Sequence, residues 1–222
     1  MSFFKKLEEL EIIYFKDCYK SCNGHCCNAD KPFNVIIPML KSEYEYIKDK
    51  TNLSLVASIA YKLKCEKTIT LCFVKCSYKG LCAFRPLACK LYPFFALVND
   101  DGLVLDINAI SLYDLFYKDF SSHPCPLIKY DFDNLKAQFL LNVKQISNEP
   151  IIIFIFRALE LLVKYLKLYL KDLYLDNCEN KKEILHKNNF LNAYKNEEFK
   201  NEINELYLRL SLKYKDNLDK YL

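Results

Sequence analysis

The chain has 222 residues and a formal net charge of +4, with 52% hydrophobic and 27% charged residues, a composition typical of a globular protein rather than a disordered one. It contains only three glycines, so it lacks the glycine-rich loops that bind nucleotide phosphates. Its positive charge is nearly all lysine, without the arginine forks or basic stripe typical of nucleic-acid readers, and we expect no nucleic-acid partner.

The N-terminus and the most apolar segment both argue against export or membrane insertion. The chain turns acidic at Glu8, which leaves no room for the apolar core of a signal peptide. Residues 150–170 are the most apolar stretch, but charges interrupt them before the roughly 20 apolar residues that a membrane span needs. We therefore expect a cytoplasmic protein without a membrane span, whose cysteines are reduced thiols rather than disulfides.

Short helices and strands are predicted along the first half of the chain. Apolar residues at helical spacing, a capping-box pattern at Ser42 and Glu45, and runs of alternating or β-branched residues indicate these elements. The predicted helices cover residues 1–16, 42–50 and 53–64. The predicted strands cover residues 35–39, 68–74, 95–98 and 103–106, the last two forming a hairpin around the turn at 99–102.

The second half of the chain is predicted to be helical, with helices at about 132–146, 149–176 and 191–220. In the middle helix the charges recur at spacings of three and four residues, which places them on one narrow stripe and leaves the rest apolar. These charges are Arg157, Glu160, Lys164, Lys167 and Lys171. Such a helix is typical of the centre of a bundle, and the terminal helix, apolar at Phe199, Ile203, Leu206 and Leu210, is its expected partner.

These patterns predict an α+β protein, mostly α, with two parts. Residues 1–130 form a small cysteine-rich metal-binding domain with short strands. Residues 131–222 form a helical C-terminal region packed on that domain, with a surface that a protein partner could bind.

The cysteines are the strongest functional feature. Of 11 in the chain, nine lie between Cys18 and Cys89. The first group is Cys18-x3-Cys22-x3-Cys26-Cys27, and the second is Cys72-x3-Cys76-x5-Cys82-x6-Cys89, while Cys125 lies between two prolines. Cysteines closely spaced on turns bring thiolates within reach of one ion, at ~2.3 Å from each sulfur. The adjacent pair in the first group indicates either two metal centres or one ligand with a neighbouring sulfur.

Other residues near the two groups have alternative interpretations. Cys65 and Cys178, on predicted helices, are interpreted as small buried apolar residues. His25 and His123 are adjacent to cysteines and are weaker ligand candidates. Arg85 precedes a turn bounded by Pro86 and Pro93 that includes Cys89, and its guanidinium could offset the negative charge of clustered thiolates; the alternative is an ordinary surface arginine.

The pattern of an early Cys-Cys pair, a following helix, Arg85-Pro86-x-x-Cys89-x-x-Tyr92-Pro93 and a late Cys125-Pro126 resembles the YkgJ-type cysteine-cluster family. The resemblance covers residues 18–128, with x3 spacings in the first group where the family has x2. It implies a zinc- or iron-chelating domain, and the family includes flagellin lysine N-methylases. The predicted ligands are Cys18, Cys22, Cys26, Cys27, Cys76, Cys82, Cys89 and Cys125, with Arg85 beside the cofactor. Which of Cys18, Cys72 and Cys76 bind the metal is left open.

The sequence therefore predicts a protein that holds zinc or an iron–sulfur centre through clustered cysteines. Thiolate-only ligation suits both, and iron–sulfur is the preferred assignment. In this interpretation Cys22, Cys26, Cys27, Cys82, Cys89 and Cys125 converge in space. Two alternatives remain: an iron–sulfur-assisted protein lysine N-methyltransferase, which only the resemblance supports, and a structural zinc domain that presents a helical interaction surface.

Overall fold

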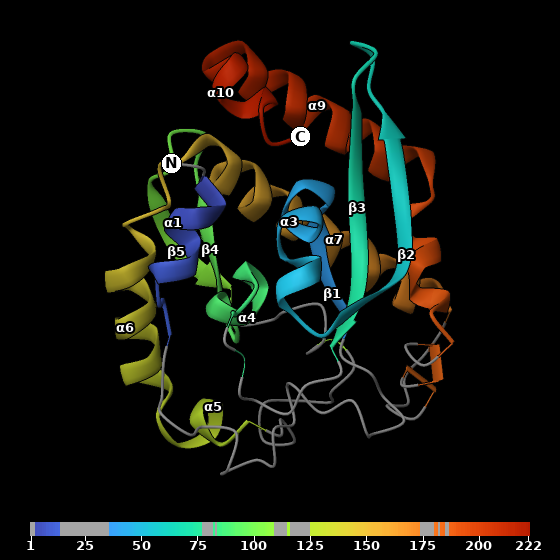
Figure 1. Cartoon of the computed structure of the whole chain (residues 1–222). Helices are drawn as coiled ribbons and strands as arrows, with labels where there is room; N and C mark the ends of the chain where they lie inside the picture. Colours follow the sequence, from blue (N-terminus) through green and yellow to red (C-terminus); the bar gives the residue numbers. More distant parts are fainter. Residues whose placement is uncertain are drawn as a thin grey trace.

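A computed structural model describes residues 3–13, 36–76, 82, 84–108, 115, 125–173, 180–181, 183–184 and 187–222. The described chain is an α+β protein with more helix than strand (Figure 1). Its elements are α1 (Phe3–Glu9), β1 (Ile36–Leu40), α3 (Lys41–Ile47), η2 (Lys48–Lys50), β2 (Leu53–Lys62), β3 (Thr68–Cys76), α4 (Leu87–Leu91), β4 (Phe95–Val98), β5 (Val104–Asn108), α5 (Pro126–Tyr130), α6 (Phe132–Val143), α7 (Pro150–Asp172), η5 (Asn189–Tyr194), α9 (Glu197–Tyr214) and α10 (Asp216–Asp219).

An antiparallel three-stranded sheet in the order β1-β3-β2 forms one side of the molecule. Side chains of a strand alternate between the two faces of its sheet. On β3, Leu71 and Phe73 belong to the main hydrophobic core, whereas Cys72 and Val74 belong to a second, smaller cluster on the opposite face. The sheet is therefore covered on both faces at β3, with α3 in front of it and α7 behind it in Figure 1, whereas β2 is mostly exposed or half-buried.

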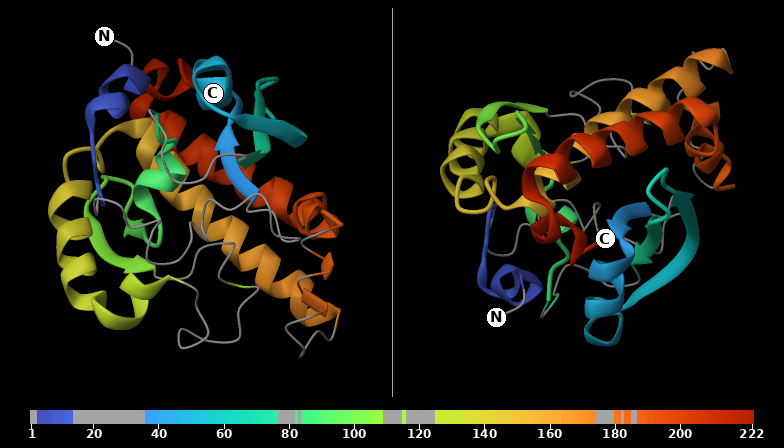
Figure 2. Two further views of the ribbon diagram at one scale, coloured as in Figure 1. Left: turned by 60° about the horizontal axis from the view of Figure 1, so that its bottom comes forward. Right: turned by 90° about the horizontal axis from the view of Figure 1, so that it is seen from above.

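The apolar helix α7 lies at the centre of the molecule. Its buried residues include Ile152, Phe156 and Leu166, and α9 runs alongside it (Figure 2, right). The predicted charged stripe is confirmed to face outward, since Lys164, Lys167 and the other three charged residues of the stripe are exposed or half-buried. Within the described residues, no helix is both long and apolar enough to cross a membrane.

The β4–β5 hairpin and α6 lie near the N-terminal half of α7, where Arg157 Nη1 donates to the Val98 carbonyl over 3.3 Å. Gly102 in the hairpin turn has φ +79°, a conformation that L side chains rarely adopt. A Cβ at this position would lie 2.3 Å from the Ser147 carbonyl oxygen. The turn therefore requires glycine for both its backbone conformation and its close packing.

The two ends of the described chain meet. The Phe3 amide donates to the Tyr221 hydroxyl over 3.3 Å, and the Ser42 hydroxyl donates to the Tyr221 carbonyl over 2.5 Å. A single cluster of buried side chains extends from Phe3 to Leu218 and includes residues of both predicted domains. The domain boundary at residues 130–131 stays a prediction.

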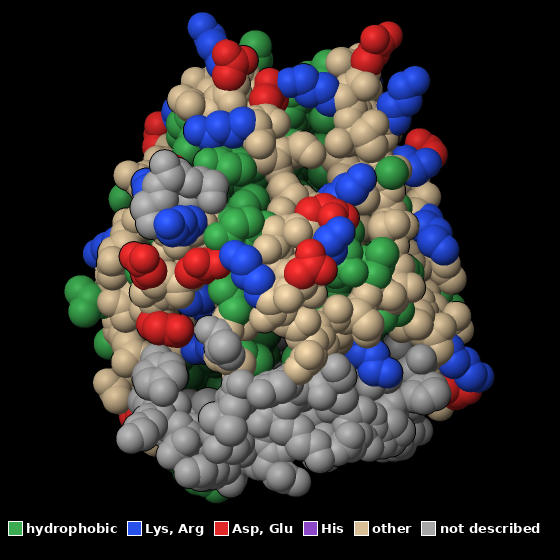
Figure 3. Space-filling view, viewed as in Figure 1, with side chains coloured by type: hydrophobic (Ala, Val, Ile, Leu, Met, Phe, Trp, Pro, Cys, Tyr) green, Lys and Arg blue, Asp and Glu red, His purple; other side chains and the backbone are tan. Residues whose placement is uncertain are grey.

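On the face shown in Figure 3, basic and acidic side chains of the described residues are interspersed. Surface ion pairs of the described residues include Lys50 with Glu8 at 2.5 Å and Arg209 with Asp100 at 2.6 Å. Exposed pairs of this kind contribute little to stability, at about 0–1 kcal/mol each. The fold is therefore held mainly by its two apolar clusters.

Most predicted elements are confirmed, but the helix predicted at 53–64 is wrong. This segment is strand β2, paired with β3 from Leu53↔Cys76 to Lys62↔Thr68. Its apolar residues fit both periods. They recur at helical spacing and also occupy every odd position from Leu53 to Tyr61, so pairing with β3 decides the outcome.

Two smaller predictions are also wrong. Ser42 does not cap α3, because the helix begins earlier, after Leu40, and has no side-chain cap. The Ser42 hydroxyl donates to the Tyr221 carbonyl instead. Cys65 is not a buried helical residue but an exposed one in the turn between β2 and β3. The first helix also ends earlier than predicted, at Glu9.

Candidate metal site

The predicted ligands fall into two sets with respect to the described chain. Cys18, Cys22, Cys26 and Cys27 lie outside the described residues, as do Cys178, His25 and His123. The other four predicted ligands are described, and all are half-buried: Cys76, Cys82, Cys89 and Cys125. The expected convergence of the first cysteine group with the second therefore stays a prediction.

Strand β3 positions two cysteines on one face of the sheet. Cys72 and Cys76 are four residues apart, so both point to the same face as Val74. Cys72 is 2% exposed and belongs to the smaller apolar cluster, whereas Cys76 is half-buried at the end of the strand. Burial raises the pKa of the Cys72 thiol, which favours its neutral form. Cys72 therefore behaves as an apolar core residue, and Cys76 is the better ligand candidate.

The short helix α4 positions Cys89. Pro86 directly precedes the helix, consistent with the predicted turn between two prolines, and Tyr92-Pro93 ends it with a cis peptide bond. Leu87 and Leu91 face the main core, while Cys89 packs against the small cluster that includes Cys72. Cys76 packs against the same cluster. Two predicted ligands from separate parts of the second cysteine group, one on a strand end and one on a turn, thus border a common apolar cluster.

Arg85 fastens the Cys89 turn to the segment after α1. Its Nη1 donates to Glu11 Oε2 over 2.9 Å and to the Ile13 carbonyl over 3.1 Å. Its Nη2 donates to the Cys89 carbonyl. The guanidinium therefore joins the backbone on which Cys89 lies to the backbone at Ile13, which precedes the first cysteine group in sequence.

Lys90 makes a second connection between the same two segments. It is 1% exposed, and its Nζ donates to the Leu10 carbonyl over 2.6 Å and to the Glu8 carbonyl over 3.3 Å, with Glu11 Oε1 at 3.4 Å. Burial lowers the pKa of Lys90, partly offset by the charge of Glu11. We call Arg85, Lys90 and Glu11 the α4 anchor. Its two cations and one carboxylate carry a net positive charge, and the Arg85 guanidinium lies against the backbone of Cys89.

Glu43 holds the other side of α4. It is 5% exposed, and its Oε1 accepts the backbone N–H of Leu87 over 2.8 Å. Burial raises the pKa of Glu43 to about 7. The turn that includes Cys89 is thus fixed between a buried carboxyl on α3 and a buried amine bonded to the segment after α1.

The two remaining described candidates, Cys82 and Cys125, belong to no helix or strand. Cys82 lies between β3 and α4, and Cys125 directly precedes α5. In Figure 1 the end of β3, α4 and α5 lie in the lower half of the molecule, away from the β2–β3 turn. Within the described residues, no group of three or more His, Cys, Asp or Glu side chains is arranged to hold a metal ion.

The described residues fit a thiophilic metal in two respects. Cys76 and Cys89 are partly accessible, unlike the core residue Cys72, and sulfur donors suit zinc and iron–sulfur centres. The α4 anchor supplies positive charge next to Cys89, which offsets part of the charge of clustered thiolates.

Neither buried ionisable residue next to α4 is among the sequence-predicted site residues. Glu43 has a detectable pattern, because Leu40, Glu43, Tyr44 and Ile47 follow helical spacing and place the carboxyl on an apolar face. Lys90 has no such pattern, since its acceptors are backbone carbonyls about 80 residues earlier in the chain.

Comparisons with known proteins identify no relative. No family model, no curated protein and no solved structure matches the chain.

Proposed function

We propose that this protein binds zinc or an iron–sulfur centre through its clustered cysteines. The observation that supports this most is that Cys76 and Cys89, from separate parts of the chain, both pack against one apolar cluster. The cations Arg85 and Lys90 fix the turn on which Cys89 lies. The eleven cysteines and their grouping are the second support. A buried apolar role fits Cys72, whereas Cys76, Cys82, Cys89 and Cys125 are only half-buried.

In this proposal the remaining ligands come from Cys82, Cys125 and the first cysteine group, of which Cys22, Cys26 and Cys27 match the resemblance best. Zinc would supply a structural cross-link between these segments, whereas an iron–sulfur centre would add a one-electron redox couple. Arg85 and Lys90 hold the Cys89 turn in place and balance thiolate charge. Iron–sulfur remains the preferred cofactor.

The test is purification of the full chain without oxygen, followed by metal analysis and a visible spectrum. We expect bound zinc, or bound iron with sulfide and a charge-transfer band, in the wild-type protein. Cys89→Ser should lose most of the metal. Cys65→Ser is the matched control, because Cys65 lies in the turn at the opposite end of β3 from Cys76, about 30 Å away for a nine-residue strand.

A metal-free wild-type protein, or equal metal loss in the two variants, would contradict the proposal. Equal loss would mean that any missing thiol lowers the metal content, wherever it lies in the fold.

Metal binding should also be linked to folding. Ligands drawn from distant segments leave mutually repelling thiolates when the metal is removed, so the chelated protein should be less stable. We expect a lower melting temperature after chelation in wild type and no further decrease in Cys89→Ser. An unchanged melting temperature in chelated wild type would show that the site does not organise the fold.

A further inference from the structure

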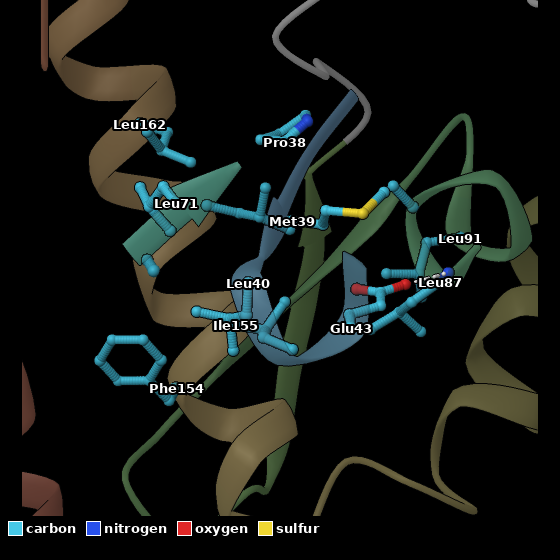
Figure 4. A pocket seen from close by; sticks show the side chains of 13 residues that line it. Pro38, Met39, Leu40, Glu43, Leu71, Leu87, Leu91, Phe154, Ile155 and Leu162 are labelled. Carbon is cyan, nitrogen blue, oxygen red and sulfur yellow. Dashed lines mark hydrogen bonds between the residues drawn. The ribbon is translucent and has the colours of Figure 1, made fainter. Parts of the chain in front are cut away.

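A small pocket lies between the three-stranded sheet and helix α7 (Figure 4). Its walls come from β1, β3, α3, α4 and α7, and its volume is about 40 Å³. Among the described residues that line it, Glu43 alone has a polar side chain; the others are apolar, among them Leu40, Leu71, Ile155 and Ala158. The pocket thus combines an apolar surface with one ionisable group.

Within the described part of the chain, only one of the two carboxyl oxygens of Glu43 accepts a hydrogen bond. Its Oε1 accepts the Leu87 N–H, and this is its one hydrogen bond within the described part of the chain. The other carboxyl oxygen points away from Leu87 (Figure 4). The side chain is 5% exposed, and burial raises its pKa to about 7. A buried carboxylate without a cation costs free energy that a positively charged hydrogen-bond donor would recover.

We propose that this pocket binds a small primary alkylammonium ion, whose N–H groups pair with the second oxygen of Glu43 while its alkyl chain contacts the apolar walls. The charge is complementary, because the lining residues that the structure describes include a carboxyl group and no cation. A water molecule fits the pocket less well, since it needs two to four polar partners and the lining side chains offer one.

The pocket volume limits the size of the ligand. A water-sized group needs roughly 10–15 Å³ of this space, so about three such groups fit. An amine with two or three carbons matches this limit. The proposal concerns a site distinct from the cysteine cluster and does not depend on a bound metal.

The test is a calorimetric and NMR titration of the full chain at pH 8, where Glu43 is mostly a carboxylate, with n-propylammonium chloride. The uncharged control of the same shape is 1-propanol. A ligand of four heavy atoms is limited to a Kd on the order of 10⁻⁴ M or weaker. We expect saturable binding of the ammonium ion and at least about 10-fold weaker binding of 1-propanol, whose hydroxyl can donate to the carboxylate but carries no positive charge.

Two variants test the geometry. Glu43→Gln retains an acceptor for Leu87 but removes the charge, and should weaken n-propylammonium binding by about 10-fold or more. Ala158→Val adds two methyl groups to the α7 wall of the pocket and leaves Glu43 unchanged, and should also abolish binding. Equal affinity for the two ligands, no saturation of wild type, or unchanged binding in either variant would overturn the proposal. If Glu43→Gln does not fold, Ala158→Val decides alone.

Discussion

The helical layer of α7, η5 and α9 and the short helix α4 both contribute to the main core but are held in different ways. All eleven buried residues of α7 are apolar or aromatic, and its charged residues lie toward the surface. By contrast, α4 has only five residues, one of them the buried Lys90. Its first residue, Leu87, donates its backbone N–H to the buried Glu43. The layer depends on apolar burial, whereas α4 depends on a few specific polar contacts.

This difference predicts different responses to substitution and to pH. Loss of an apolar side chain leaves a cavity, whose cost is independent of pH. Loss of a buried polar group can lower the stability, because its hydrogen-bond partner is left unsatisfied. It can also raise the stability, because a charge that was costly to bury is removed. Which effect is larger depends on whether the buried group is charged at the pH of the measurement. The following predictions test the comparison from the largest expected effect to the smallest.

Phe199→Ala should have the largest effect, since the helical layer depends on its apolar core. Phe199 is fully buried, and its ring lies 5.3 Å from that of Tyr165 and 5.4 Å from those of Tyr61 and Tyr194. We expect a decrease of about 3–5 kcal/mol in the free energy of unfolding by urea. Leu212→Ala on the same helix, where the leucine is 82% exposed, should change it by less than about 0.5 kcal/mol. A similar small cost for both would contradict the assigned packing of α9.

Glu43→Gln should reveal the pH dependence of the α4 side. The folded protein keeps a proton on Glu43 up to pH about 7, whereas an unperturbed carboxyl releases it near 4.5. Wild type should therefore lose stability as the pH rises through this window, by on the order of 3 kcal/mol. The variant lacks this loss, so its stability relative to wild type should increase between pH 4.5 and 8.

The measurement is urea unfolding of both proteins at several pH values. Glu45→Gln is the matched control on the same helix, because Glu45 is exposed and its bond to Lys48 lowers its pKa. The stability of this control relative to wild type should fall slightly, rather than rise, as the pH increases. A difference between Glu43→Gln and wild type that is constant with pH would show that Glu43 is not buried as described.

Lys90→Met tests the α4 anchor. Methionine fills the space of the lysine stem but cannot donate to the carbonyls of Leu10 and Glu8. We expect a loss of about 1–3 kcal/mol in thermal or urea unfolding, because these acceptors are left unsatisfied. Lys167→Met, at an exposed position of α7, serves as the control. If Lys90→Met were more stable than wild type, the cost of burying the amine would exceed the value of its bonds.

Lys164→Gln should have the smallest effect. Lys164 Nζ lies 2.6 Å from Glu202 Oε1, but the lysine side chain is 50% exposed. Such a pair is worth less than about 1 kcal/mol and is weakened by salt. We expect a change below about 0.5 kcal/mol that disappears in 1 M salt, measured by urea unfolding. A larger change that persists in salt would mean that surface pairs contribute to the helical layer as much as its core.

Local sequence patterns were sufficient to predict an element where its apolar residues followed either helical or strand spacing, but not both. The strand at 68–74, the hairpin around Gly102 and the charged stripe of α7 were all predicted, because each depends on neighbouring residues in the chain. The segment at 53–64 has apolar residues at both helical and strand spacing, so only its pairing with β3 makes it a strand. Competition between two local periods is resolved by a distant partner, which the local pattern does not contain.

At the candidate site, the sequence by itself determined the residue types and their grouping: two cysteine groups, a turn between Pro86 and Pro93, and an arginine next to it. Only the tertiary structure decided which thiols are core residues, because β3 alternation and the α4 contact bury Cys72 and leave Cys76 and Cys89 half-buried around the same cluster. It also decided that Glu43 and Lys90 are buried, since burial of a charge requires partners from distant segments, here Leu87 for one and Leu10 for the other.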